Sequence, residues 1–222
     1  MMIQNTYQHA GYHMLLQLAI DCFTLEEALT ITGEVPDLVD IVEAGTPLIL
    51  KEGISAVRRL KEEFPSLCIL ADMKIIDGAE YESRLAFDAG ADIVTVLAAA
   101  EDRTIAISTK IAEEYGKEVM VDLIGLGDAA GRASEIEKLG ARYLCVHRAT
   151  DLESDGSASR DQFRKVKRAA GHMKIAVAGG IDITVLEDIK KPQPDIAIVG
   201  SYITACENRR EAALRIHNYM KA

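Results

Sequence analysis

Polar side chains that could do acid–base or metal chemistry stand at or just after the short apolar runs of this sequence. Five of them are carboxylates, and one lysine and one histidine accompany them. They are Asp21, Glu43, Asp72, Lys74, Asp77, Asp122 and His147. Carboxylates gathered at one place repel one another unless a cation lies among them. The set therefore predicts a divalent metal ion, a buried lysine or both, and oxygen ligands without a Cys/His cluster favour Mg2+ over Zn2+.

Each of these residues also has a purely structural interpretation. A single Asp after a strand often caps the helix that follows. A lone histidine at a strand end is often a structural or solvent-facing side chain. The grouping of the charges, rather than any one residue, is what indicates a functional site.

Two glycine-containing turns form a second candidate site. The segments Ala176-Val-Ala-Gly-Gly-Ile and Ile198-Val-Gly-Ser each end an apolar run. Glycine lets backbone N–H groups approach an anion closely, and a helix N-terminus adds favourable partial charge. The turns therefore predict a phosphate site and a phosphorylated sugar as ligand, although tight turns alone would explain them too. The residues concerned are Gly179, Gly180, Gly200 and Ser201.

The elements that must position these residues alternate along the whole chain. Eight short apolar runs are separated by segments of helical periodicity. The runs are Leu15–Ile20, Leu38–Val42, Leu67–Met73, Ala91–Leu97, Glu118–Ile124, Arg142–His147, Lys174–Ala178 and Asp195–Val199. Most are continuously apolar, which is typical of parallel strands covered on both faces. The alternation predicts a single (β/α)8 barrel, with the active site at the carboxyl ends of the strands; a doubly wound open sheet is the competing architecture.

The helical segments carry end signals of their own. Thr24, with Glu27 three residues later, is a capping-box pattern. Glycine follows several helices, where a left-handed residue commonly ends them. The glycines are Gly90, Gly116, Gly140 and Gly171. The longer helices are predicted over Glu52–Glu63, Glu80–Ala89, Ile105–Tyr115, Ala129–Leu139, Asp161–Ala170 and Glu207–Met220.

The composition narrows the classes of function and the domain organisation. The 222 residues carry a net charge of −10, contain no Trp and are 5% aromatic, so binding to nucleic acid is not expected. No apolar run approaches the roughly 20 residues of a membrane span. Four widely separated cysteines and the lack of a signal-peptide pattern predict a cytoplasmic protein with reduced thiols. We expect residues 1–13 to be a flexible extension and residues 14–222 to form the barrel.

Several motifs, in this order along the chain, resemble the orotidine monophosphate decarboxylase suprafamily. They are Leu16-Gln-Leu-Ala-Ile-Asp, Val42-Glu-Ala-Gly-Thr-Pro, Ala71-Asp-Met-Lys-Ile-Ile-Asp, Val119-Met-Val-Asp-Leu-Ile-Gly and Val177-Ala-Gly-Gly-Ile. The D-x-K-x-x-D core of the third motif is the signature of the group. The resemblance extends from about Leu15 to the C-terminus. Within the group it is greatest to the 3-hexulose-6-phosphate synthases, with the 3-keto-L-gulonate-6-phosphate decarboxylases as a sister branch.

The resemblance implies a role for each matching residue. Glu43 and Asp72 would bind Mg2+, and Asp21 would contact substrate hydroxyls. Lys74 would stabilise an enediolate, and His147 would transfer the proton. The carboxylate at the decarboxylases' glutamate position would lie near the reacting carbon, and the glycine turns would hold the phosphate. In this chain that carboxylate belongs to Asp122.

The resemblance also implies an assembly and a reaction. Asp77 would reach across a homodimer interface into the neighbouring subunit's site. The reaction would be a reversible, Mg2+-dependent condensation of ribulose 5-phosphate with formaldehyde to 3-hexulose 6-phosphate. The alternatives are decarboxylation of a 3-keto sugar-acid phosphate and a phosphosugar-binding barrel without turnover.

A few positions separate the two enzyme branches. Those at which the chain resembles the synthases are Asp122, Thr150 and Ala178. Arg148, in contrast, follows His147 as it does in the decarboxylases. The next segment, 151–157, is acidic and polar, and Asp155 would place an extra negative charge near the opening. A shifted substrate specificity is therefore a further possibility.

Overall fold

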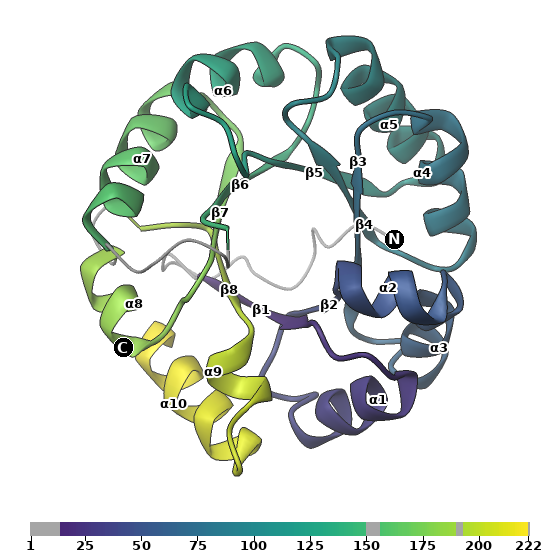
Figure 1. The fold of residues 1–222 in the computed structure, drawn as a ribbon, viewed down its shortest axis with the longest axis vertical. Helices are drawn as coiled ribbons and strands as arrows, with labels where there is room; N and C mark the ends of the chain where they lie inside the picture. The colour runs from purple at the N-terminus through teal and green to yellow at the C-terminus, as the bar shows by residue number, and fades with distance from the viewer. Residues whose placement is uncertain (1–13, 150–155, 190–192, 222) are drawn as a thin grey trace.

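Eight parallel strands close into a barrel that is surrounded by helices (Figure 1). The computed structural model describes residues 14–149, 156–189 and 193–221, so the expected extension over residues 1–13 lies outside the described residues. The strands pair in chain order, and β8 returns to pair with β1. They are β1 (Leu15–Ile20), β2 (Ile41–Ala44), β3 (Cys68–Ile75), β4 (Ile93–Leu97), β5 (Glu118–Asp122), β6 (Tyr143–His147), β7 (Lys174–Ala178) and β8 (Ile196–Val199). The predicted (β/α)8 architecture is confirmed.

The longer helices lie where the periodicity predicted them, in a ring outside the strands (Figure 1). They are α1 (Leu25–Glu34), α3 (Ser55–Glu63), α4 (Ala79–Asp88), α5 (Asp102–Tyr115), α6 (Ala129–Glu137), α7 (Gly156–Ala169) and α10 (Arg209–Lys221). Thr24 caps α1 as predicted, with its hydroxyl accepting from the Glu27 N–H at 3.3 Å. Gly116, with φ +64°, ends α5 in the left-handed conformation.

No bounds were predicted for three short helices, although a helix N-terminus was expected after each of the two glycine turns. The three helices are α2 (Thr46–Glu52), α8 (Ile183–Ile189) and α9 (Ser201–Thr204). Each spans two turns or fewer, which is too short for a helical hydrophobic period to stand out. The proline after Thr46 is the one local signal for α2, because proline is favoured at the first helical positions.

The second strand begins three residues later than the sequence predicts. Leu38 and Val39 are buried, but they belong to a turn after α1 that is closed by the Leu38 N–H and the Val35 carbonyl at 3.0 Å. The helix-to-strand turn is itself covered by the core, so its apolar residues extend the run beyond the strand. The strand proper is therefore Ile41–Ala44.

Two apolar cores flank the strands because successive strand residues point to opposite sides. The larger core lies between the strands and the helices. The smaller one fills the barrel interior, and its buried members are Ala19, Ile41, Leu70, Ile93, Met120, Tyr143, Cys145, Ala176, Ile196 and Ile198. At the carboxyl ends of the strands, the barrel interior continues beyond this smaller core. Side chains that point inward there are therefore directed toward one common opening.

Asp92 ties three strands together at the opposite, amino-terminal end of the barrel. Its carboxylate accepts from Lys61 Nζ at 2.8 Å, from Lys117 Nζ at 2.6 Å and from the Ile69 N–H at 2.9 Å. Partial burial raises the pKa of Asp92, but the bonds from Lys117, Lys61 and Ile69 outweigh burial and hold the pKa below its ordinary value. The carboxylate therefore stabilises the fold in its charged form.

We expect Asp92→Asn to lower the free energy of unfolding by about 2 kcal/mol at neutral pH, because two lysines lose their partner. The folded-state pKa lies below the unfolded value of 3.8, so this contribution is complete above that pH and is lost as the pH falls further. Urea unfolding at neutral pH and at about pH 3 measures the difference. The exposed Asp161, changed to Asn, is the control. A difference that does not shrink in acid would contradict the assignment.

Candidate active site

A cavity of about 850 Å3 opens at the carboxyl ends of the strands. It is lined by side chains from all eight strands or from the turns that follow them. Ten of the eleven predicted site residues line it. They are Asp21, Glu43, Asp72, Lys74, Asp122, His147, Gly179, Gly180, Gly200 and Ser201. The structure thus brings together residues that lie up to 180 positions apart in the chain.

Lys74 is placed by an irregularity in β3. The pairing of β3 with β4 shifts register between Ala71 and Ile75, and Lys74 has a φ of +47°, which is uncommon for a residue with a side chain. The Lys74 N–H donates to Thr95 Oγ1 at 2.8 Å, which holds the irregular backbone. As a result the Lys74 ammonium forms an ion pair with the Asp72 carboxylate. Strained backbone of this kind is concentrated at functional sites.

Asp72 is buried, and both of its carboxylate oxygens accept hydrogen bonds. Its Oδ1 accepts from Thr95 Oγ1 at 2.8 Å, and its Oδ2 accepts from Thr46 Oγ1 at 2.7 Å and from Lys74. Burial raises the pKa of Asp72, but the Lys74 charge and these hydrogen bonds outweigh it and lower the pKa. Asp72 is therefore a charged carboxylate in a nearly closed environment.

Glu43, on β2, lacks such compensation. Burial, followed by the negative charge of Asp72, raises its pKa well above the usual range. Its Oε2 accepts from Gln17 Nε2 at 2.6 Å, and the buried Gln17 Oε1 has no hydrogen-bond partner among the described residues. Two buried carboxylates and a spare amide oxygen form a set of hard oxygen donors, which suits Mg2+. The residues present therefore fit the predicted ion.

Asp122 and His147 form a second polar pair on neighbouring strands. Asp122 Oδ2 lies 2.8 Å from His147 Nδ1, and Asp122 Oδ1 accepts from the Ile124 N–H at 2.9 Å. A carboxylate can only accept, so the proton of a neutral imidazole lies on Nδ1 and Nε2 is left as the acceptor. The pair thus has the arrangement of an oriented general base.

Cys145 is a cavity residue that the sequence analysis did not single out. It lies opposite Asp122 in the strand register and two positions before His147, on the same face of β6. The three side chains offer metal-ligand atoms within 4.8 Å of one another. Burial raises the pKa of the Cys145 thiol well above its ordinary value, so the thiol is neutral. The period-2 alternation of β6 is the signal that could have found it.

Asp21 reaches the cavity because of a close approach between two turns. A Cβ at Gly45 would lie 2.6 Å from the carbonyl oxygen of Ile20 and would overlap the Asp21 carboxylate. Only glycine fits there, which explains why the motif Val42-Glu-Ala-Gly-Thr-Pro has glycine at position 45. The glycine brings the end of β1 against the start of α2.

The glycine turn after β7 is also sterically required. Gly179 and Gly180 have φ values of +97° and +68°, and a Cβ at Gly179 would overlap the carbonyl oxygen of Arg148. The geometry of a tight turn is therefore present. This geometry is compatible with anion binding, because the turn faces the same cavity as Gly200 and Ser201.

One predicted site residue, Asp77, does not line this cavity, and a further group of residues lies outside the described part of the chain. Asp77 is exposed, caps the Gly78 N–H with its own carboxylate at 2.7 Å and does not line the cavity of its own chain. Thr150 and the acidic residues 151–155 lie outside the described residues. A partner subunit is the one way in which Asp77 could act at such a site.

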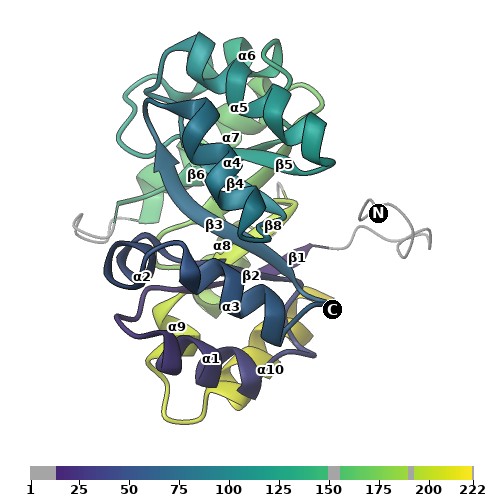
Figure 2. The same ribbon diagram turned by 90° about the vertical axis from the view of Figure 1, so that its right-hand side faces the viewer.

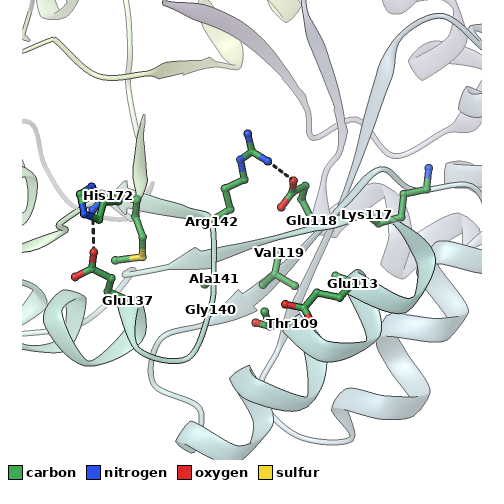
Figure 3. A pocket seen from close by; sticks show the side chains of 12 residues that line it. Thr109, Glu113, Lys117, Glu118, Val119, Glu137, Gly140, Ala141, Arg142 and His172 are labelled. Carbon is green, nitrogen blue, oxygen red and sulfur yellow. Dashed lines mark hydrogen bonds and ion pairs between the residues drawn. The ribbon is translucent and has the colours of Figure 1, made fainter. Parts of the chain in front are cut away.

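A second cavity, of about 470 Å3, lies at the amino-terminal ends of β5, β6 and β7 (Figure 3). Its charges are largely satisfied internally. Arg142 pairs with Glu118 at 2.7 Å, and Glu137 accepts from the His172 N–H at 2.8 Å. None of the predicted site residues lines it, so the candidate site is the cavity at the opposite end.

A closed (β/α)8 barrel with an ion-paired lysine, an Asp–His pair and glycine turns at its carboxyl-terminal mouth has the organisation of a barrel enzyme. Comparison with known proteins is more specific. The chain belongs to the Orotidine 5'-phosphate decarboxylase / HUMPS family, which matches residues 14–216. It is accordingly an enzyme of the lyase type.

Individual relatives are similar over nearly the whole chain. The 3-hexulose-6-phosphate synthase of Bacillus subtilis is 41% identical over 203 residues, which are 91% of this chain and 97% of that protein. The crystal structure of 3-hexulose-6-phosphate synthase from Salmonella typhimurium is 41% identical with a TM-score of 0.90, over 94% of this chain and 99% of that one. The 3-keto-L-gulonate-6-phosphate decarboxylase from Vibrio cholerae is 29% identical with a TM-score of 0.82, over 94% and 98%. Among the described residues, no helix combines the length and apolarity that a membrane span requires.

Proposed function

We propose that the chain condenses ribulose 5-phosphate with formaldehyde to give 3-hexulose 6-phosphate. The observation that carries the proposal is that an oriented base, His147 on Asp122, shares one cavity with an ion-paired lysine, Lys74 on Asp72. Such a set can remove a proton beside a ketone and stabilise the charge that results. The greater identity to proteins named synthase than to those named decarboxylase supports this reaction.

The proposed chemistry uses His147 twice. Nε2 takes a proton from C1 of ribulose 5-phosphate, and the electron pair forms an enediolate whose charge lies on the C2 oxygen. The Lys74 ammonium stabilises that oxygen electrostatically. C1 then attacks the formaldehyde carbon, so that a C–C bond forms and the C2 carbonyl is restored. The π electron pair of formaldehyde moves to its oxygen, which receives the proton from His147 and becomes the new hydroxyl.

We propose that Glu43 and Asp72 hold Mg2+ in this cavity. The support is the donor set, in which the buried Glu43 has a strongly raised pKa and Asp72 is charged. When bound, the ion would supply positive charge beside the oxygens of the enediolate. Asp21 lies at the same mouth and would bind substrate hydroxyls.

We also propose that the chain forms a homodimer through the side that carries α2 and α4 (Figure 2). Four large apolar side chains are exposed on these described elements, namely Leu50 on α2, Ile76 after β3, and Tyr81 and Leu85 on α4. Ile76 directly precedes Asp77, so an interface at this place would bring Asp77 to the partner chain. Clustered exposed apolar side chains are typical of an interaction surface.

Tyr81→Glu is expected to weaken the dimer at least about tenfold and to lower kcat with it, since Asp77 would leave the neighbouring site. Sedimentation velocity over a range of concentrations, with activity measured at each, tests this. Leu214→Glu changes an exposed apolar residue on α10 and should leave assembly and activity unchanged. A wild-type monomer with full activity would disprove the dimer.

The function itself is tested by comparing two reactions of the purified enzyme. Formaldehyde consumption with ribulose 5-phosphate is measured with Mg2+ and with a chelator, and carbon dioxide release is measured with 3-keto-L-gulonate 6-phosphate. We expect Mg2+-dependent formaldehyde consumption at the higher kcat/KM. Faster release of carbon dioxide would assign the decarboxylase reaction instead, and turnover of neither substrate would favour a binding barrel.

A further inference from the structure

The cavity mouth is acidic, although its proposed substrate carries a phosphate dianion. Among the described residues, five carboxylates line the cavity, and the cationic side chains are Lys74, Arg148 and, when protonated, His147. The carboxylates are Asp21, Glu27, Glu43, Asp72 and Asp122. Backbone N–H groups of glycine turns carry only partial charges, so a dianion entering this field needs a full positive charge nearby.

Two of the three cationic groups are already committed to carboxylates. Lys74 is ion-paired with Asp72, and His147 is hydrogen-bonded to Asp122 at 2.8 Å. Both are placed for chemistry at the reacting carbons in the function proposed above. Neither is therefore free to neutralise a phosphate group at the other end of the substrate.

Arg148 differs from both. Among the described residues no carboxylate pairs with its guanidinium, and its Nε is buried without a hydrogen-bond partner. A buried donor without a partner loses its hydrogen bonds to water, and no hydrogen bond within the protein compensates for that cost. A bound ligand that supplies an acceptor would compensate for it. A guanidinium that no described carboxylate pairs with, and that lies beside this cavity, is suited to bind an anion.

The backbone places this guanidinium at the glycine turn. The Arg148 N–H donates to the Ala178 carbonyl at 3.1 Å, which fixes the residue at the end of β7. Its Nη2 lies 3.4 Å from the position that a Cβ would occupy at Gly180, so the side chain packs along the turn itself. The cation and the glycine N–H groups consequently share one side of the cavity.

We propose that Arg148 is the charge partner of the substrate's phosphate group and sets the affinity of the enzyme for phosphorylated over unphosphorylated sugars. This rests on the proposed function only in that the substrate is a sugar phosphate. A guanidinium can donate two parallel N–H bonds to phosphate oxygens, which a lysine cannot reproduce. The arginine at this position, which the sequence aligns with the decarboxylase branch, thus has a binding role independent of which reaction follows.

Arg148→Gln is the first test, with Arg148→Lys as the conservative variant. We expect the Kd of ribulose 5-phosphate, measured by calorimetry, and its KM to rise about 30- to 100-fold in Arg148→Gln, while kcat changes less than about threefold. Arg148→Lys should recover part of the affinity. Inorganic phosphate should compete with ribulose 5-phosphate in the wild type and do so far less in Arg148→Gln.

Unphosphorylated ribulose separates charge recognition from a general disturbance of the site, because its weak binding should be the same in all variants. Arg142→Gln, which breaks the pair with Glu118 at the other end of the barrel, is the matched control and should bind the phosphate ester normally. An unchanged Kd in Arg148→Gln overturns the proposal, and so does a loss of kcat at constant affinity. Because binding is measured directly, the proposal can succeed or fail whether or not formaldehyde proves to be the second substrate.

Discussion

Replacing His147 with alanine is expected to lower kcat about 10²- to 10⁴-fold, which is the usual contribution of a positioned general acid–base group. The imidazole is held by Asp122 through Nδ1, at 2.8 Å from the carboxylate, which leaves Nε2 for the substrate. In the proposed reaction, its removal takes away both the acceptor for the C1 proton and the donor to the new hydroxyl. Substrate affinity should change little, and initial rates with saturating ribulose 5-phosphate measure the loss.

The matched control is His172→Ala, which removes an exposed histidine at the opposite end of the barrel and should retain full activity. Asp122→Asn is the companion variant. Its amide could donate to Nδ1 and would favour the tautomer with the proton on Nε2, so kcat should fall although the imidazole is still present. Full turnover in His147→Ala would show that His147 is not the catalytic base.

The second large effect is expected at Asp72. Asp72→Asn keeps the shape but loses the charge that pairs with Lys74 and, with Glu43, would bind Mg2+. We expect kcat to fall about 10²- to 10³-fold, as when one electrostatic stabiliser of a developing oxyanion is lost. The affinity for Mg2+ should fall at least about tenfold, measured by titration calorimetry in the absence of substrate.

Glu113→Gln, at an exposed carboxylate of the other cavity, is the control for a general change in charge. Glu43→Gln should resemble Asp72→Asn in its loss of Mg2+ affinity while leaving the Lys74–Asp72 ion pair in place. Wild-type activity that persists in a chelator, together with unaltered Mg2+ binding in Asp72→Asn, would contradict the metal site.

Much of the barrel and of its mouth could be predicted from the sequence because both depend on local patterns. A continuous apolar run ended by a charged residue, as at Ile20 and Asp21, predicts a buried strand and its functional end together. In a parallel barrel all such ends meet at one face, so Glu43 and His147 could be brought together without knowledge of their distance.

Features that depend on contacts between distant segments could not be predicted in this way. The left-handed backbone of Lys74 follows from a register shift against β4 and from the hydroxyl of Thr95. The sequence pattern of β3 shows neither of these features. The orphaned Nε of Arg148 likewise depends on how the turn after β7 passes beside it. Such features required the packed structure.

We propose above that this cavity forms a carbon–carbon bond between a ribulose 5-phosphate enediolate and formaldehyde. The most direct measurement is 13C NMR of the enzyme with ribulose 5-phosphate and 13C-labelled formaldehyde, with and without Mg2+, for the wild type and His147→Ala. We predict that the label enters the terminal hydroxymethyl carbon of a hexulose 6-phosphate, only with Mg2+ and only in the wild type. Label that remains in formaldehyde while ribulose 5-phosphate binds normally would contradict it.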